Sequence, residues 1–213
     1  MDDTTTWKMI HQERAATADT LASLNPTQWT QTSLCGSWTV REVAAHIVIG
    51  AEQTTGHFLG GMVKNGFRFN TMMDREARRV GTRDSAELIA RLRARLTTTN
   101  HPPAAPVMTM LGEVVVHSDD IRRPLSIPSE TDPQVLTACL EMYKTATFPF
   151  GTKKRIDGLR LVATDLDWSH GVGPEVTGPA LSLVMAMTGR AAALDDLGGD
   201  GAATLRRRMH AGS

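Results

Sequence analysis

The sequence contains little cysteine, few aromatic residues and no excess charge of either sign. Its two cysteines, Cys35 and Cys139, match neither a CxxC motif nor a disulfide framework, which favours a reducing compartment. The 23 Lys and Arg residues balance 23 Asp and Glu residues, so the sequence lacks the basic field that binding to nucleic acid without sequence preference requires. These shortages favour a protein that acts on small molecules and binds no nucleic acid.

Long apolar runs are also missing. No segment approaches the roughly 18 consecutive apolar residues of a membrane helix. The first residues, MDDT, are acidic and polar, whereas a signal peptide would be basic and then apolar. The sequence therefore predicts a cytoplasmic protein with no membrane partner.

The residues that are present are those of a folded globular chain. Hydrophobic residues make up 41% of the sequence and charged residues 22%, which is ordinary for a soluble domain and too apolar for a disordered one. A length of 213 residues exceeds one average domain but falls short of two. We therefore expect a main domain with a smaller appendage.

Apolar residues recur at steps of three and four over much of the first 143 residues, which predicts helices. Thr39 and Glu42 have the spacing of a capping box, or Ser37 caps the same helix instead. Val114, Val115 and Val116 alone would indicate a strand, but the longer run around them is periodic and favours a helix. Residues 67–82 give no clear assignment. The predicted helices cover residues 7–24, 38–62, 84–96, 107–125 and 133–143.

The pattern changes after about Lys154. Short apolar segments at 159–164 and 166–168 predict strands, and glycines between 171 and 178 predict turns. A further helix is expected from Pro179 to Arg190, and a short one after Gly201. The chain is therefore predicted to be mainly α-helical, with a small α+β module at its C-terminal end.

Two polar residues on an apolar helix face require an explanation. Glu113 and His117 are four residues apart, so a helix places them on one face about 6 Å from each other. Their neighbours on that face, Met110, Val114 and Ile121, are apolar. An ionised carboxylate in such surroundings is costly unless a metal ion or a charge partner compensates it. The pair is therefore either part of a metal site or a salt bridge.

A catalytic zinc site uses about three protein ligands and one open position, so a third ligand is needed. His46 is the best candidate, because it lies among aliphatic residues of its helix, and His57 on the same predicted helix is the reserve. The alternative for His46 is a hydrogen-bonded core histidine. Asp120 would follow His117 by about one turn and could accept its second imidazole N–H.

Asp119 and Asp120 have a second interpretation. With Arg122 and Arg123 they could instead form a solvated charge cluster, which is the more common role of such runs.

Two motifs carry a family resemblance. Residues 36–46, GSWTVREVAAH, resemble the second-helix motif of the mycothiol-dependent maleylpyruvate isomerase family, which belongs to the DinB-like metal-binding four-helix bundles. Residues 112–125, GEVVVHSDDIRRPL, resemble the family's second ligand motif. The resemblance implies that His46, Glu113 and His117 are the ligands of Zn²⁺ or another divalent metal.

The resemblance extends toward the C-terminus, where Asp167, Trp168, residues 173–176 and residues 178–180 follow the pattern of the family's small α+β domain. It implies a DinB-like bundle over residues 1–152 and the α+β domain over 153–213. It also implies that Arg190 is a catalytic residue, although an arginine that ends a helix is equally often a partner for the helix dipole. The C-terminal module is short, and residues 67–106 match no family motif, so substrate-binding residues cannot be transferred.

By the same resemblance, the thiol cosubstrate is mycothiol, and the metal would stabilise its thiolate for attack on a small electrophile. S-transfer is favoured over maleylpyruvate-type cis-trans isomerisation, because one degradation step can employ few members of a large family. The rival from another class is a non-catalytic metal-binding or ligand-binding protein. Cys35 is expected to be structural, since the reactive sulfur would come from the cosubstrate, and the chain is expected to be a monomer or a homodimer.

Overall fold

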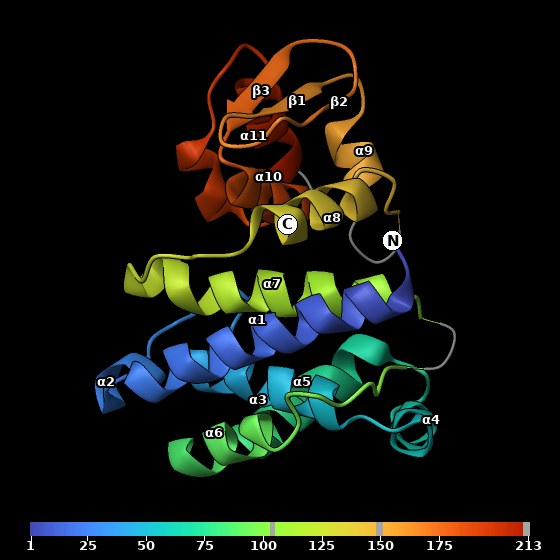
Figure 1. Cartoon of the computed structure of the whole chain (residues 1–213), viewed down its shortest axis with the longest axis vertical. Helices are drawn as coiled ribbons and strands as arrows, with labels where there is room; N and C mark the ends of the chain where they lie inside the picture. The colour runs from blue at the N-terminus through green and yellow to red at the C-terminus, as the bar shows by residue number, and fades with distance from the viewer. Residues whose placement is uncertain (103–104, 148–150, 211–213) are drawn as a thin grey trace. The chain divides into compact units, whose positions relative to one another are not determined.

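The structure of the chain is a computed structural model that describes residues 1–102, 105–147 and 151–210. It is mainly α-helical, with a small sheet near the C-terminus (Figure 1). Two compact units divide the chain, Met1–Ser129 and Glu130–Ser213. Among the described residues, no helix combines the length and the apolar character needed to cross a bilayer.

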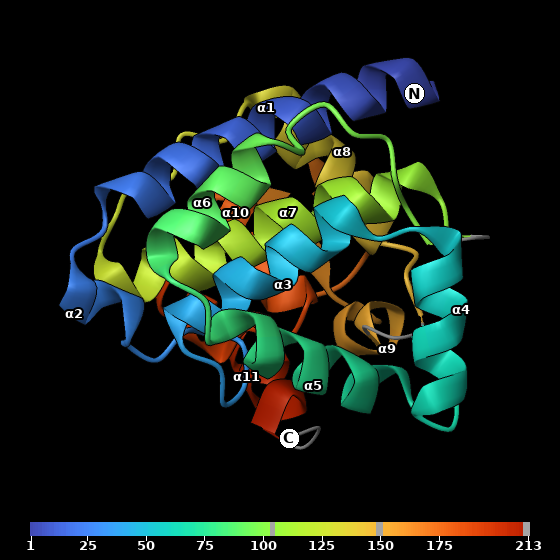
Figure 2. The same ribbon diagram turned by 90° about the horizontal axis from the view of Figure 1, so that it is seen from below.

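The first unit is a helical bundle. Helices α1 and α3 both pack against α7, while α5 and α6 pack on α3, and α6 also contacts α1 (Figure 2). The bundle interior is filled by aliphatic side chains such as Ile10, Leu21, Val43, Leu88 and Leu111. Its elements are α1 (Asp3–Ser23), α2 (Pro26–Trp29), α3 (Val40–Glu52), α4 (Thr55–Lys64), α5 (Phe69–Gly81), α6 (Ser85–Arg93), α7 (Val107–Arg122) and the 3-10 turn η1 (Arg123–Leu125).

The helix predicted over residues 38–62 is wrong in its length, because it is two helices. Helix α3 ends at Glu52, and Gln53 is extended. The hydroxyl of Thr54 then accepts the backbone N–H of His57 at 3.2 Å and caps α4. A threonine that can cap a new helix at this place competes with continuation of the first one. His57 is therefore not on the helix that carries His46.

Other boundaries of the bundle agree with the periodicity. The capping box at the start of α3 is confirmed, since the Glu42 carboxylate accepts the backbone N–H of Thr39 at 2.7 Å. The three consecutive valines are helical and lie within α7. Burial on nearly every side of this helix outweighs the strand preference of β-branched residues. The unassigned segment 67–82 contains α5, whose buried residues lie at helical spacing.

The second unit combines helices with a three-stranded sheet of order β2-β1-β3. Strand β1 pairs antiparallel with β2, with Leu161 opposite His170, and parallel with β3, with Leu161 opposite Val176. Helix α10 packs on α8 and on β1. The elements are α8 (Pro133–Tyr143), α9 (Thr152–Ile156), β1 (Arg160–Ala163), β2 (Ser169–His170), β3 (Glu175–Gly178), α10 (Ala180–Met187), the 3-10 helix η2 (Ala191–Asp196) and α11 (Ala202–His210).

This α+β unit differs from the sequence-based expectation in three respects. The compact unit begins at Glu130 and not at residue 153, because α8 packs against α10 of the same unit. Residues 166–168 form a turn, closed by a hydrogen bond from the Trp168 N–H to the Leu166 carbonyl, and the strand starts one residue later. Strand β3 replaces part of the expected turn region, because its backbone pairs with β1.

Candidate metal centre

The structure brings the three predicted ligands together. His46 comes from α3, and Glu113 and His117 come from α7 one turn apart. One ligand atom from each of them lies within 4.8 Å of the others. The two imidazole rings are 4.7 Å apart between centroids and nearly perpendicular, at 83°. Two imidazoles and a carboxylate therefore converge on one point from two packed helices.

A glycine makes room for this convergence. Gly50 follows His46 by four residues on α3 and so lies on the same face, opposite α7. A Cβ atom built at Gly50 would be only 3.3 Å from Oε1 of Glu113. The missing side chain allows the Glu113 carboxylate to lie between the two helices.

His117 is oriented by a buried carboxylate. Its Nδ1 lies 2.9 Å from Oδ2 of Asp120, and Asp120 is fully buried. A carboxylate accepts here, so Nδ1 carries the proton, and the lone pair of His117 is then on Nε2. This is the arrangement in which a histidine ligates a metal while its other nitrogen holds an acidic partner. The contact predicted between His117 and Asp120 is therefore present.

The alternative interpretation of residues 119–123 was a solvated charge cluster, and it describes only some of these residues. Arg123 forms an ion pair with Asp119 at 2.8 Å, and Arg122 donates to the hydroxyl of Thr20 at 2.9 Å. Asp119 and Arg122 are nevertheless buried. Asp119 therefore pairs with an arginine, as the charge-cluster interpretation predicts, whereas Asp120 contacts His117.

His46 is buried, with 8% of its surface exposed, and its ring lies 5.2 Å from that of Trp38 between centroids. Its Nε2 is 3.0 Å from Oε1 of Glu113. Its Nδ1 is buried and has no hydrogen-bond partner within the described ranges of the chain. Without a metal, the pair is a hydrogen bond between imidazole and carboxylate, which is the salt-bridge alternative. A bound metal would use the same atoms.

The electrostatics keep the Glu113 carboxylate ionised. Burial by itself raises the pKa of Glu113, but the hydrogen bond from His46, together with the electrostatic influence of His46, His117 and Arg14, outweighs it, so the pKa of Glu113 lies below the ordinary value. Arg14 is itself buried, and burial lowers its pKa. Its guanidinium donates to the carbonyl of Thr98 at 2.8 Å. An ionised carboxylate at neutral pH is the state that a metal ligand requires.

A cysteine also lies close to this cluster. One atom each of Cys35, His117 and Asp120 falls within 4.8 Å of the others. The backbone N–H of Leu34, next to it, donates to the carbonyl of Asp120 at 3.1 Å and ties the loop to α7. The sequence places Cys35 in the loop before the ligand helix, but no sequence pattern predicts that Cys35 lies near His117. The loop's connection to α7 is tertiary and leaves no sequence signal.

The two remaining candidates lie elsewhere. His57, the reserve ligand, is on α4 and belongs to neither of the two potential metal-binding groups found in the described part of the chain, so its reserve role is wrong. Arg190 follows α10 in the second unit and donates to the carbonyl of Thr188 at 3.0 Å. Burial, and secondarily the charge of Arg190, lowers the pKa of its neighbour Arg155. The catalytic role of Arg190 stays a prediction.

The donor set fits a divalent metal of the zinc type. His₂Glu is a set that catalytic zinc sites use, with the fourth position left to water or substrate. The convergence of the ligand atoms, the acidic partner of His117 and the ionised state of Glu113 all meet the requirements of such a site.

Comparison with known proteins gives a consistent result. Residues 10–107 match the family described as the mycothiol maleylpyruvate isomerase N-terminal domain. A crystal structure of the mycothiol-dependent maleylpyruvate isomerase superposes with a TM-score of 0.66 at 14% identity, over 95% of this chain and 94% of that one. A crystal structure of a histidine-to-alanine mutant of that enzyme gives 0.65 at the same identity and coverage. No curated protein sequence matches the chain. The structural matches show the fold, and they agree with the predicted fold class.

Proposed function

Because the chain belongs to the mycothiol-dependent maleylpyruvate isomerase family, we propose that it is a metal-dependent enzyme that uses mycothiol as its thiol cosubstrate. Its ligands are His46, Glu113 and His117, and its metal is Zn²⁺ or another divalent cation. The favoured reaction is transfer of the thiol to a small electrophile. The observation that carries the proposal is the convergence of the three ligand atoms within 4.8 Å.

The three ligands and the residues that contact them have different roles in this mechanism. When bound, a divalent cation stabilises the thiolate of a coordinated thiol and so provides a nucleophile at neutral pH. His46 and His117 supply neutral nitrogen ligands, and Glu113 supplies a carboxylate that its surroundings keep ionised. Asp120 holds the proton of His117 at Nδ1 and fixes the ring. Trp38, beside His46, covers one side of the cluster.

The transfer step is a nucleophilic substitution or addition at carbon. The sulfur electron pair forms a carbon–sulfur bond with the electrophile. In substitution the leaving group departs with its bonding pair, whereas in addition a proton from solvent completes the product. The thiol proton is released to solvent when the thiolate forms. The stable product is a thioether, so one mycothiol is consumed per turnover.

Two alternatives use the same residues. In cis-trans isomerisation the adduct rotates about the former double bond and expels the thiolate, so the thiol is recovered. This alternative is supported by the names of the structural neighbours, which are mycothiol-dependent isomerases. A non-catalytic metal-binding protein would retain the metal but process neither substrate. Thiol consumption therefore separates S-transfer from isomerisation, and turnover separates both from simple binding.

The experiment uses the purified chain loaded with zinc and supplied with mycothiol and either monochlorobimane or chlorodinitrobenzene. The unsubstituted protein is expected to bind about one zinc and to consume the thiol. His117→Ala should lose both zinc retention and thiol transfer, because one of about three protein ligands is removed. Full zinc occupancy in that variant would remove His117 from the ligand set, and zinc binding without thiol loss or isomerisation would favour the non-catalytic alternative.

Arg190 is tested separately. If it stabilises developing negative charge on the substrate, Arg190→Ala should lower kcat by about tenfold or more and leave zinc content unchanged. Arg160→Ala is a suitable control, since Arg160 is an exposed arginine paired with Glu175 at 3.2 Å in the same unit. Equal activity of the two variants would show that Arg190 is not catalytic and would favour its role as a partner for the helix dipole. The cytoplasmic location and the monomeric or homodimeric state stay predictions.

A further inference from the structure

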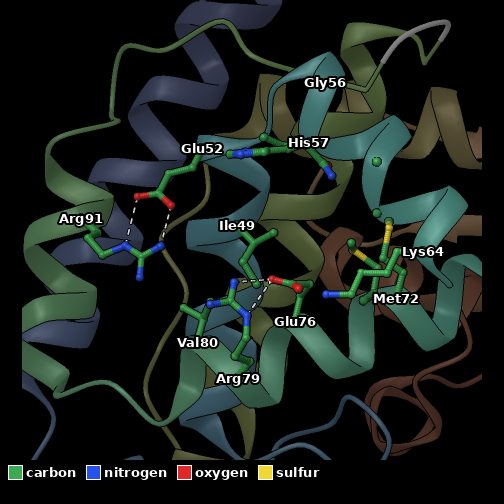
Figure 3. A pocket seen from close by; sticks show the side chains of 14 residues that line it. Ile49, Glu52, Gly56, His57, Lys64, Met72, Glu76, Arg79, Val80 and Arg91 are labelled. Carbon is green, nitrogen blue, oxygen red and sulfur yellow. Dashed lines mark hydrogen bonds and ion pairs between the residues drawn. The ribbon is translucent and has the colours of Figure 1, made fainter.

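A cavity lies in the first unit, and the three residues assigned to the metal do not line it. It has a volume of about 420 Å³ and is lined by residues of α3, α4 and α5 together with Arg91 of α6 (Figure 3). This volume is in the range of small-molecule sites. His46, Glu113 and His117 are not among its lining residues. The cavity is therefore distinct from the candidate metal centre.

One wall of this cavity is apolar. Ile49 of α3 and Met72, Met73 and Val80 of α5 contribute to it. Met72, Met73 and Val80 are buried residues of the bundle core, with at most 7% of their surface exposed. Methionine side chains adapt to ligands of different shape, because they are unbranched and polarisable. This wall can accept the apolar body of a small molecule.

Helix α4 forms another wall and contributes three glycines to the cavity, Gly56, Gly60 and Gly61. A Cβ atom built at Gly56 or at Gly60 would have no other atom within 4 Å. Gly61 differs, since a Cβ there would be 2.6 Å from the sulfur of Met72 and would disturb the packing of α4 on α5. Glycine destabilises a helix relative to alanine. Packing within the described chain explains Gly61, but it does not explain Gly56 or Gly60, whose lack of side chains keeps the cavity open.

The charged groups around the cavity are mostly paired. Arg91 makes two hydrogen bonds to Glu52, at 2.6 and 3.1 Å. Arg79 makes two to Glu76, at 2.5 and 3.2 Å. Three lysine or arginine residues and two glutamates line the cavity, which leaves one excess positive charge, on Lys64.

Lys64 and His57 are the two polar residues that α4 adds to the rim. Both are exposed, and in Figure 3 both extend from α4 toward the space bounded by Ile49 and Glu76. Within residues 1–102, 105–147 and 151–210, neither side chain has a hydrogen bond or ion pair. An ammonium and an imidazole N–H are thus available to an acceptor in the cavity.

We propose that this cavity binds a small organic carboxylate, with its apolar body against Met72 and Ile49 and its carboxylate toward Lys64 and His57. The inference does not depend on the proposed enzymatic function, since it uses none of the metal ligands. The size of the cavity, its adaptable apolar wall, its open glycine face and its single uncompensated cation all fit this class of ligand.

The test compares two probes of equal shape, 3-phenylpropionate and its neutral amide, titrated into the full chain in the presence of EDTA. EDTA removes any metal through which a carboxylate could bind at the other site. Binding is followed by the backbone amide NMR shifts of α4 and α5. The carboxylate is expected to bind about threefold to fivefold more tightly than the amide, the size of an exposed ion pair. Shifts confined to other helices, or equal affinities, would overturn the proposal.

Two pairs of variants complete the test. Lys64→Gln should remove the preference for the carboxylate and leave amide binding unchanged, whereas Lys153→Gln, an exposed lysine of α9, should keep it. Gly60→Leu should abolish binding of both probes by filling the cavity, whereas Val63→Leu, at a 66% exposed position of α4 outside the cavity, should not. Retained binding in Gly60→Leu, or a retained preference in Lys64→Gln, would refute the assignment.

Discussion

Asp120 offers the sharpest test of the metal centre, because it acts on the metal only through His117. Its Oδ2 lies 2.9 Å from His117 Nδ1, and the residue is fully buried. Asp120→Asn keeps the shape and an acceptor oxygen but removes the charge. Asp120→Ala removes the acceptor altogether, and burial prevents water from easily replacing it. The two variants therefore separate the effect of charge from the effect of the hydrogen bond.

Loss of such a partner typically costs tenfold to a hundredfold in metal affinity. We expect about tenfold for Asp120→Asn, which retains an acceptor, and about a hundredfold for Asp120→Ala. These losses correspond to about 1.4 and about 2.7 kcal/mol of binding free energy. Asp120→Ala should also lower the melting temperature of the metal-free chain, because it leaves a buried imidazole N–H unpaired.

The assay is competition for Zn²⁺ against a chromophoric chelator, with circular dichroism as the check on folding. Asp119→Asn is the matched control, since Asp119 is the neighbouring buried aspartate but pairs with Arg123 at 2.8 Å. It should leave zinc affinity within about twofold of the original. If both Asp120 variants hold zinc as tightly as the unsubstituted chain, Asp120 does not support a metal ligand. If Asp119→Asn weakens zinc binding as much as they do, the effect is not specific to the partner of His117.

Two further predictions concern Glu113. Gly50→Ala adds a Cβ 3.3 Å from Oε1 of Glu113, so zinc affinity should fall severalfold, even though alanine is the better helix former by about 1 kcal/mol. Zinc titrations measure the affinity, and thermal melts in parallel measure the stability of the helix. An unchanged or higher zinc affinity in Gly50→Ala would contradict the prediction. Because the pKa of Glu113 is lowered in the folded chain, its carboxylate stabilises the fold above the ordinary value of 4.5, and this stabilisation is lost as pH falls through the folded value. Without metal, the melting temperature of Glu113→Gln should therefore depend less on pH below 4.5 than that of the unsubstituted chain. Thermal melts of both proteins from pH 7 to pH 3 measure this, and parallel profiles of the two would disprove it.

Local signals in the sequence were sufficient for much of the bundle. The capping box of Thr39 and Glu42 marked the start of α3, and the apolar periodicity located α1, α6, α7 and α8. These features depend on contacts within a few residues, so they are readable from the chain itself. The interruption between α3 and α4 was missed, since Thr54 could occupy a helix interior as well as a cap.

The small sheet shows the opposite case. Strand β3 gains its hydrogen bonds from β1, and β2 from the other edge of β1. With two to four residues each, these strands carry too little alternation to be distinguished from turns. For a related reason, the second compact unit starts at Glu130 and not at residue 153, where the sequence predicts the second domain. Helix α8 packs on α10, about forty residues later in the sequence.

At the candidate site, the sequence by itself determined that Glu113 and His117 share a helix face, because a spacing of four fixes that geometry wherever the helix lies. Tertiary structure alone decided that His46 and not His57 joins them, that Gly50 leaves space for the carboxylate and that Cys35 lies beside His117. Those outcomes depend on which faces of α3, α7 and the preceding loop pack together. Packing is set by the whole core at once, and no short stretch of sequence encodes it.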